Sequence, residues 1–258
     1  MTTVPRVKSF SLPEESSRWI VYHLDSPDST AAQAADTTER PGAAAATPGG
    51  VARPIADSAW RRRRPTGTPL VVRDLAQGGE VRIADVMAYE VDKRGRWLVY
   101  TVASADSTRD GAYARELDAG RVVELATGPG SYKQLSLDDA AQQVAFVSDR
   151  DVRDSTSKRR YAVYHARLGA GEAARVVAPD AFGDDERIAD GARLSFTRNG
   201  AALLFGVQPV PPDSIPADSL AEMAVFDLWH WKDDRLQPQQ RVEAGRDRNR
   251  SHQVIHHI

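Results

Sequence analysis

The sequence predicts an all-β protein, a partial β-propeller built from four-stranded blades. Apolar stretches of strand length recur along the chain, two short sequence patterns repeat in alternation, and no helical periodicity is sustained over three turns. Short strands at a spacing of about ten residues are typical of sandwiches, barrels and propellers. The internal repeat favours the propeller, because a sandwich is not expected to repeat one unit along the chain.

The strand predictions rest on short runs rich in β-branched and aromatic residues, which fit a half-buried pleated surface. The runs of this composition are 7–12, 19–24, 70–75, 97–102, 144–147, 161–164 and 203–205. Polar segments rich in turn-forming residues separate them, so each run is predicted to be a separate strand.

The first repeated pattern is an apolar pair, a loop of five to seven polar or small residues, and an apolar triplet that ends in an aromatic residue. Its four copies end at Tyr22, Tyr100, Phe146 and Phe205. The loops contain turn formers, of which Asn199-Gly200 is the strongest hairpin signal. The pattern predicts an antiparallel hairpin at the start of each blade.

The second pattern is an apolar strand, an arginine with or without an acid, a leucine, small residues and a glycine. Its copies end at Gly78, Gly120 and Gly171, and another short strand is predicted after each glycine. One copy of each pattern makes a unit of about four strands, as in a propeller blade. We therefore expect about four blades plus a stub strand at 252–258, which is a segment of a larger ring.

One stretch, 25–68, differs from the rest of the chain. It is rich in Ala, Pro, Gly, Ser and Thr, and its only large apolar residues are Val51, Ile55 and Trp60. Such a segment buries too little apolar surface to offset its ordering entropy, so a disordered low-complexity insertion is predicted. The expected organisation is the start of the first visible blade at 1–24, the insertion at 25–68, and the remaining blades at 69–258.

Composition excludes several classes of function. The 34 Lys and Arg residues nearly balance the 36 Asp and Glu residues, for a net charge of −2, so no global basic surface for nucleic acid is expected. No apolar run approaches the roughly 18–20 residues that span a bilayer. The chain has no cysteine, which excludes disulfides, thiolate zinc sites and a cysteine nucleophile. No cofactor is predicted.

The block 227–240, followed by 246–251, resembles a signature from the propeller of a large bacterial branch of the prolyl oligopeptidase family of serine peptidases. The phrases at 95–100, 111–117 and 145–150 and the opening at 4–15 are similar to the same proteins, so the resemblance covers essentially the whole chain. It implies an N-terminal propeller that admits small peptides, and a C-terminal α/β-hydrolase domain with a Ser, Asp and His triad.

The chain departs from this family in one respect. It contains no Gly-x-Ser-x-Gly, and the nearest text, at 128–132, lacks both the spacing and a following helix. No alternation of strands and helices could build a hydrolase sheet. We therefore expect no catalytic residue here, but a non-catalytic propeller portion whose partners are a hydrolase domain absent from the chain and an oligopeptide substrate.

The sequence leaves alternatives for the function and for the localisation of the protein. A stand-alone TolB-like or WD-repeat-like propeller that binds proteins or glycans is the alternative hypothesis for function. The family resemblance suggests a periplasmic or secreted parent, whereas residues 1–5 show neither the basic nor the apolar region of a signal peptide.

Trp229, His230 and Trp231 are the candidate channel or interface residues. On a predicted strand, alternation places the two tryptophans on one face and the histidine on the other. In one interpretation these aromatic side chains pack between adjacent blades, with the histidine satisfied in the core or interface. In the other they form a stacking surface for substrate in the central channel.

The histidines of the terminal strand do not form a predicted metal site. His252 and His256 would share one face of a strand, but they lie about 13 Å apart by strand rise, which is too far for one ion. No nearby carboxylate cluster completes a site, so no metal ligand is predicted.

Overall fold

The computed structural model describes residues 4–25, 65–152, 159–211 and 230–258. Within these ranges the chain forms strands β1 to β15, the helix α4 and a short 3₁₀ helix, η1 (Ser107–Arg109). The predicted all-β class is confirmed. Most of the predicted insertion, 26–64, lies outside the described residues, so its disorder stays a prediction. No helix in the described ranges is long and apolar enough to cross a membrane.

The first sheet has seven strands in chain order and contains two blades joined edge to edge. Its strands are β1 (Val7–Ser11), β2 (Trp19–Leu24), β3 (Thr68–Asp74), β4 (Glu80–Val91), β5 (Trp97–Val102), β6 (Gly111–Glu116) and β7 (Val122–Thr127). The long strand β4 belongs to both blades, because its first half pairs with β3 and its second half with β5. Asp85 lies between these halves with a left-handed φ of 59°.

The third blade is a four-stranded sheet of β8 (Tyr132–Leu137), β9 (Gln143–Ser148), β10 (Ala162–Arg167) and β11 (Ala174–Val177). The last sheet contains β12 (Glu186–Ile188), β13 (Ser195–Phe196), β14 (Ala202–Pro209) and β15 (His252–His257). Strand β15 pairs along 202–207 of β14, so β12 and β13 share the opposite edge as two parts of one interrupted strand.

The hairpins predicted from the first pattern are all present. The apolar partners are Phe10 with Tyr22, Val91 with Leu98, Leu137 with Val144, and Phe196 with Leu203. In the last three hairpins the first turn residue caps the turn with its side chain. Trp97 N donates to Asp92 Oδ1 at 2.6 Å, Gln143 N to Asp138 Oδ1 at 2.7 Å, and Ala202 N to Thr197 Oγ1 at 3.0 Å. These caps fix the same register in these three copies.

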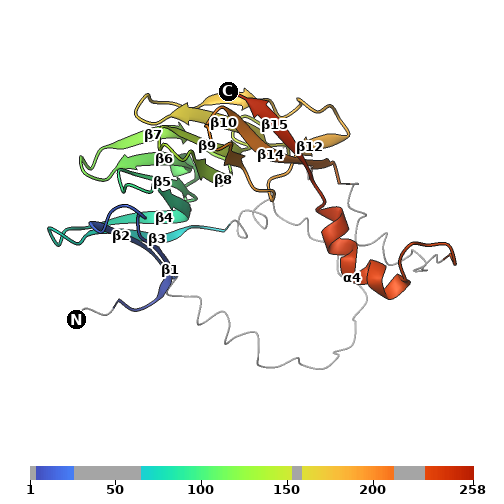
Figure 1. Ribbon diagram of the computed structural model, residues 1–258, viewed down its shortest axis with the longest axis horizontal. Coiled ribbons are helices and arrows are strands. Elements are labelled where there is room, and N and C mark those ends of the chain that lie inside the picture. Colours follow the sequence, from blue (N-terminus) through green and yellow to red (C-terminus); the bar gives the residue numbers. More distant parts are fainter. Residues whose placement is uncertain (1–3, 26–64, 153–158, 212–229) are drawn as a thin grey trace, which may run out of the picture.

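The hydrophobic core lies between neighbouring blades, in three layers. Tyr100 belongs to the layer between the first and second blades, Phe146 to the second layer and Phe205 to the third. Each of these repeated aromatic residues therefore packs toward the preceding blade. The blades consequently stack in chain order, as the colours of Figure 1 show, and no closed ring forms among the described residues.

The helix α4 (Gln237–Arg248) was not predicted. It has no apolar stripe, since Val242 is 85% exposed, and a helix without such a stripe leaves no periodic signal in the sequence. Local contacts stabilise it instead: Pro238 lies in its first turn, and Arg235 Nη1 pairs with Glu243 at 2.7 Å and Asp247 at 2.9 Å. Figure 1 draws α4 apart from the sheets.

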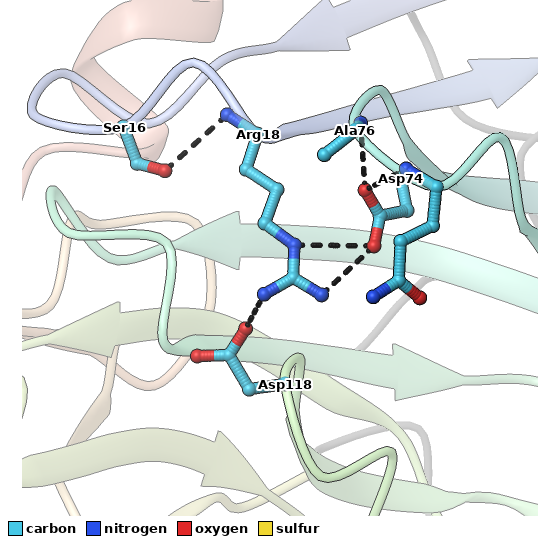
Figure 2. Close-up of polar contacts among 6 residues, drawn as sticks. Ser16, Arg18, Asp74, Ala76 and Asp118 are labelled. Atoms are coloured by element: carbon cyan, nitrogen blue, oxygen red, sulfur yellow. Dashed lines mark hydrogen bonds and ion pairs between the residues drawn. The ribbon is translucent and has the colours of Figure 1, made fainter.

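A cluster of charged residues joins the first two blades (Figure 2). Arg18, just before β2, donates from Nε and Nη2 to Asp74 Oδ2 at 3.1 and 2.9 Å, and from Nη1 to Asp118 Oδ1 at 2.6 Å. Asp74 Oδ1 also accepts from the backbone N–H groups of Ala76 and Gln77 at 2.8 and 3.0 Å. The hydrogen bonds from Arg18 outweigh burial and hold the pKa of Asp74 below its usual value, and the two backbone N–H groups act in the same direction.

This cluster predicts a pH-dependent contribution to stability. A carboxylate with a lowered pKa stabilises the fold above the unfolded pKa of about 4, and the stabilisation is lost as the pH falls through the lowered value. We expect Asp74→Asn to have a lower urea midpoint than the wild type at pH 7, and the two midpoints to converge in acid. Asp118→Asn, at an exposed position of the same cluster, is the matched control and should change the midpoint less. An offset for Asp74→Asn that is independent of pH would contradict the prediction.

Candidate functional site

The first strand of each blade is irregular at a corresponding position. Register shifts occur between Val7 and Ser9 in β1, between Val86 and Ala88 in β4, and between Lys133 and Ser136 in β8. In the last blade the interruption is complete, because residues 189–194 separate β12 from β13. Strand β8 contacts both β4 and β13, so these first strands converge on one wall. Bulges redirect side chains and are common beside binding sites. The candidate site is therefore the wall formed by β1, the second half of β4, β8, and the interrupted strand of β12 and β13, which we call the inner wall.

Polar side chains link the inner strands at each blade boundary. Ser9 Oγ lies 3.4 Å from the Tyr89 hydroxyl between the first two blades, and Leu137 N donates to Glu90 Oε2 at 3.0 Å between the next two. Between the third and fourth blades, Lys133 Nζ donates to Asp190 Oδ2 at 2.5 Å, and Gln134 Nε2 donates to the Asp190 carbonyl at 3.0 Å. The wall therefore combines a cation, two carboxylates and amide and hydroxyl groups.

Lys133 keeps its positive charge in this wall. Burial by itself would lower its pKa. The hydrogen bond to Asp190 and the electrostatic interactions with Tyr161 and Asp190 more than offset burial, so the pKa is raised. Its Nζ also lies 5.3 Å from the centroid of the Tyr161 ring, a cation–π distance. The Lys133–Asp190 pair is thus a charged contact between the third and fourth blades.

Glu90 is the exception within its repeat. The other copies of the first pattern carry serine between their two apolar residues, at Ser11, Ser136 and Ser195. Burial raises the pKa of Glu90, although the N–H of Leu137 and the charge of Arg193 act in the opposite direction. A carboxyl group that is costly to ionise, in place of a repeated serine, marks Glu90 as a candidate functional residue.

The raised pKa of Glu90 gives a second pH prediction. Because burial favours the neutral carboxyl group, protonation of Glu90 stabilises the fold below the unfolded pKa of about 4.3. This stabilisation is lost as the pH rises through the raised pKa of the folded state. Glu90→Gln keeps an acceptor for Leu137 N and removes the charge. We expect this variant to have a higher urea midpoint than the wild type at pH 7 and an equal one at pH 3. A lower midpoint at pH 7 would show instead that the charge is stabilising.

Of the three site residues predicted from the sequence, Trp229 lies outside the described residues. His230 and Trp231 precede α4 in a turn, so the strand predicted for them is wrong. His230 Nδ1 accepts from Lys232 N at 3.1 Å, and Asp233 Oδ2 accepts from His230 N at 3.0 Å. Trp231 is 75% exposed and stacks at 5.8 Å on His230. The assignment of these residues to a channel or an interface stays a prediction.

The histidines considered as metal ligands, His252 and His256, lie on β15. His252 Nε2 lies 3.8 Å from Glu186 Oε1, and the described part of the chain contains no group of three or more side chains that could hold a metal ion. Sequence reasoning missed Lys133 and Asp190, because their pairing depends on the contact between two blades. Glu90 could have been found from the serine repeat.

The fold and this wall define the class of the protein as a β-propeller module with a polar inner wall. No protein-family model matches the chain, and no curated protein matches it. Among solved structures, the chain is similar to dipeptidyl peptidase 4 of Porphyromonas gingivalis, at 12% identity and a TM-score of 0.48, over 79% of this chain and 29% of that one.

Two other solved structures represent the classes considered from the sequence. A structure from a study of two prolyl endopeptidases is 12% identical with a TM-score of 0.43, over 78% of this chain and 26% of that one. TolB from Acinetobacter baumannii is 14% identical with a TM-score of 0.36, over 54% of this chain and 31% of that one. The chain spans less than a third of the length of each of these structures.

Proposed function

We propose that residues 1–258 are the non-catalytic propeller portion of a prolyl oligopeptidase-like serine peptidase. In this role the propeller admits short peptides and excludes folded proteins, while a hydrolase domain outside these residues carries the catalytic serine. The observation that carries the proposal is the block 227–240, which resembles the family signature and occurs in a chain of repeated blades.

The inner wall supports this role. An extended peptide presents backbone N–H and C=O groups together with charged ends and side chains. Gln134 and Lys133 can donate hydrogen bonds, and the carboxylates of Glu90 and Asp190 can accept them. Such a wall suits reversible contact with a passing peptide, whereas the chemical step belongs to the other domain.

The second candidate function is that of a stand-alone TolB-like or WD-repeat-like propeller that binds proteins or glycans. The absence of Gly-x-Ser-x-Gly from residues 1–258 agrees with this candidate as well as with the first, since a binding module needs no nucleophile. The two candidates differ in what the coding sequence holds beyond these residues.

The test is to read the coding sequence in frame beyond codon 258 and to produce the full-length protein. We expect a hydrolase domain with a Gly-x-Ser-x-Gly elbow, and cleavage that declines as the peptide substrate lengthens and is absent for a folded protein. Replacing the elbow serine with alanine is the control for contaminating peptidases. If no hydrolase domain follows, the peptidase proposal fails; if cleavage is indifferent to substrate size, the gating role fails.

A further inference from the structure

The last residue of the chain occupies a repeated position. In the first three blades, a leucine just after the third strand donates its backbone N–H to the residue just before the second strand. These hydrogen bonds run from Leu75 to Arg18 at 2.7 Å, from Leu117 to Arg96 at 2.8 Å, and from Leu168 to Gln142 at 2.8 Å. Ile258 N donates to Ala201 O at 3.1 Å in the same way. Ile258 therefore corresponds to the leucine of the second sequence pattern.

This equivalence corrects the position of the terminal strand. We expected 252–258 to be the stub of a further blade, but β15 is the third strand of the fourth blade, paired with β14. The sequence pattern did not show this, because histidines replace the arginine and the acid, and no glycine follows within the chain. In blades one to three the outer edge of the third strand is paired with β4, β7 or β11, whereas no described strand pairs with the outer edge of β15.

The face of β15 that carries Ile255 is exposed as well as its outer edge. Val72 and Ala114, at the position of Ile255 in the first two blades, are buried in the layers that pack against the following blade, whereas Ile255 is 57% exposed and no described blade follows it. The backbone N–H and C=O groups of a strand point alternately to its two edges, so half of those in β15 point away from β14. A strand edge of this kind is a template for another strand.

The fourth strands of the first three blades share a pattern of residue types. Opposite the position of Val254, the fourth strand always carries a charged residue: Arg82 faces Val71, Glu124 faces Tyr113, and Arg175 faces Tyr164. Opposite the position of Ile255 it carries a small or apolar residue, namely Val81, Val123 or Ala174. Opposite the position of Gln253 it carries Ile83, Ala126 or Val177.

We propose that the outer edge of β15 binds an extended polypeptide segment from outside residues 1–258, antiparallel to β15. This segment carries a small or apolar residue against Ile255, a charged residue against Val254 and an apolar residue against Gln253. The pairing completes the fourth blade. The inference rests on the repeat of the blades and is independent of the peptidase proposal.

A synthetic peptide with the sequence of residues 172–178, which contains β11, tests the edge directly. Added to the chain, it is expected to slow amide hydrogen exchange at 252–257 by about tenfold or more, with no comparable change at β7 or β11. A peptide of the same sequence with N-methylated backbone amides keeps the side chains, loses the donors, and should give no protection. Protection that is absent, or spread equally over β7 and β11, would overturn the proposal.

A second experiment supplies the strand in the same chain. The sequence of residues 169–177 is appended after Ile258, because Ile258 corresponds to Leu168, and a scrambled version of the same nine residues is the control. We expect the native-order extension to raise Tm by about 3 °C or more over the scrambled one, since tethering gives the strand a high effective concentration. Equal Tm values would count against the proposal.

A second copy of this chain is the competing occupant of the edge. Sedimentation velocity of residues 1–258 would then show a dimer, and protection at 252–257 would depend on protein concentration without any peptide. That result would replace the proposed segment by self-association. A monomer whose β15 becomes protected only with the peptide supports the proposal.

Discussion

Replacing Phe146 with alanine is expected to lower the free energy of unfolding by about 3–5 kcal/mol, the range for deleting a buried aromatic side chain. Phe146 is fully buried between the second and third blades. Its ring stacks on Tyr164 with centroids 5.3 Å apart and lies 6.0 Å from Tyr132. Because both flanking sheets are held by backbone hydrogen bonds, we expect them to relax only in part around the cavity that the substitution leaves. Urea denaturation followed by tryptophan fluorescence measures the loss.

The control for this prediction is another phenylalanine of the chain. Phe10 is 65% exposed on β1, so Phe10→Ala removes a similar side chain from water and not from a core layer. We expect it to change the free energy of unfolding by less than about 0.5 kcal/mol. Equal losses for the two variants would mean that Phe146 does not lie between packed blades.

Replacing Gly67 with alanine is expected to cost about 3 kcal/mol, although it adds only one methyl group. The new Cβ would lie 2.0 Å from the carbonyl oxygen of Asp85 and 2.5 Å from the nitrogen of Val86. Both atoms belong to the backbone of β4 where it passes from the first blade to the second, so no side chain can rotate away. The strands must separate instead, which is the usual cost of overpacking.

Gly79→Ala is the matched control, because a Cβ at Gly79 would meet no atom within 4 Å. Its free energy of unfolding should stay within about 0.5 kcal/mol of the wild type. The comparison uses urea midpoints at equal slope, so that a change in the unfolded state is recognised. A Gly67→Ala variant as stable as Gly79→Ala would contradict the close approach of the chain at 67 to β4.

Much of the fold could be predicted from the sequence because its signals are local. The hairpin between β4 and β5 depends on alternating apolar residues and on the turn begun by Asp92, all within a short stretch of chain. The run at 97–102 coincides with β5, and 19–24 with β2. The aromatic residues at Tyr100, Phe146 and Phe205 repeat because each blade presents the same face to its predecessor.

The helix α4 and the turn at Trp231 could not be predicted in this way. Their side chains are largely exposed, so no periodic burial is written into the sequence there, and the two tryptophans near His230 favoured a strand. The polar inner wall was missed for a different reason. Asp190 and Lys133 are far apart in the chain, and only the stacking of two blades brings them together.

By itself, the sequence determined the all-β class, the repeated hairpins and their register, because strand alternation and turn caps act between residues close in the chain. Only the tertiary structure decided that β4 serves two blades, that the inner strands share one polar wall, and that β15 belongs to the fourth blade with an open outer edge. These features depend on which strands meet across blades, and such contacts follow from packing in three dimensions.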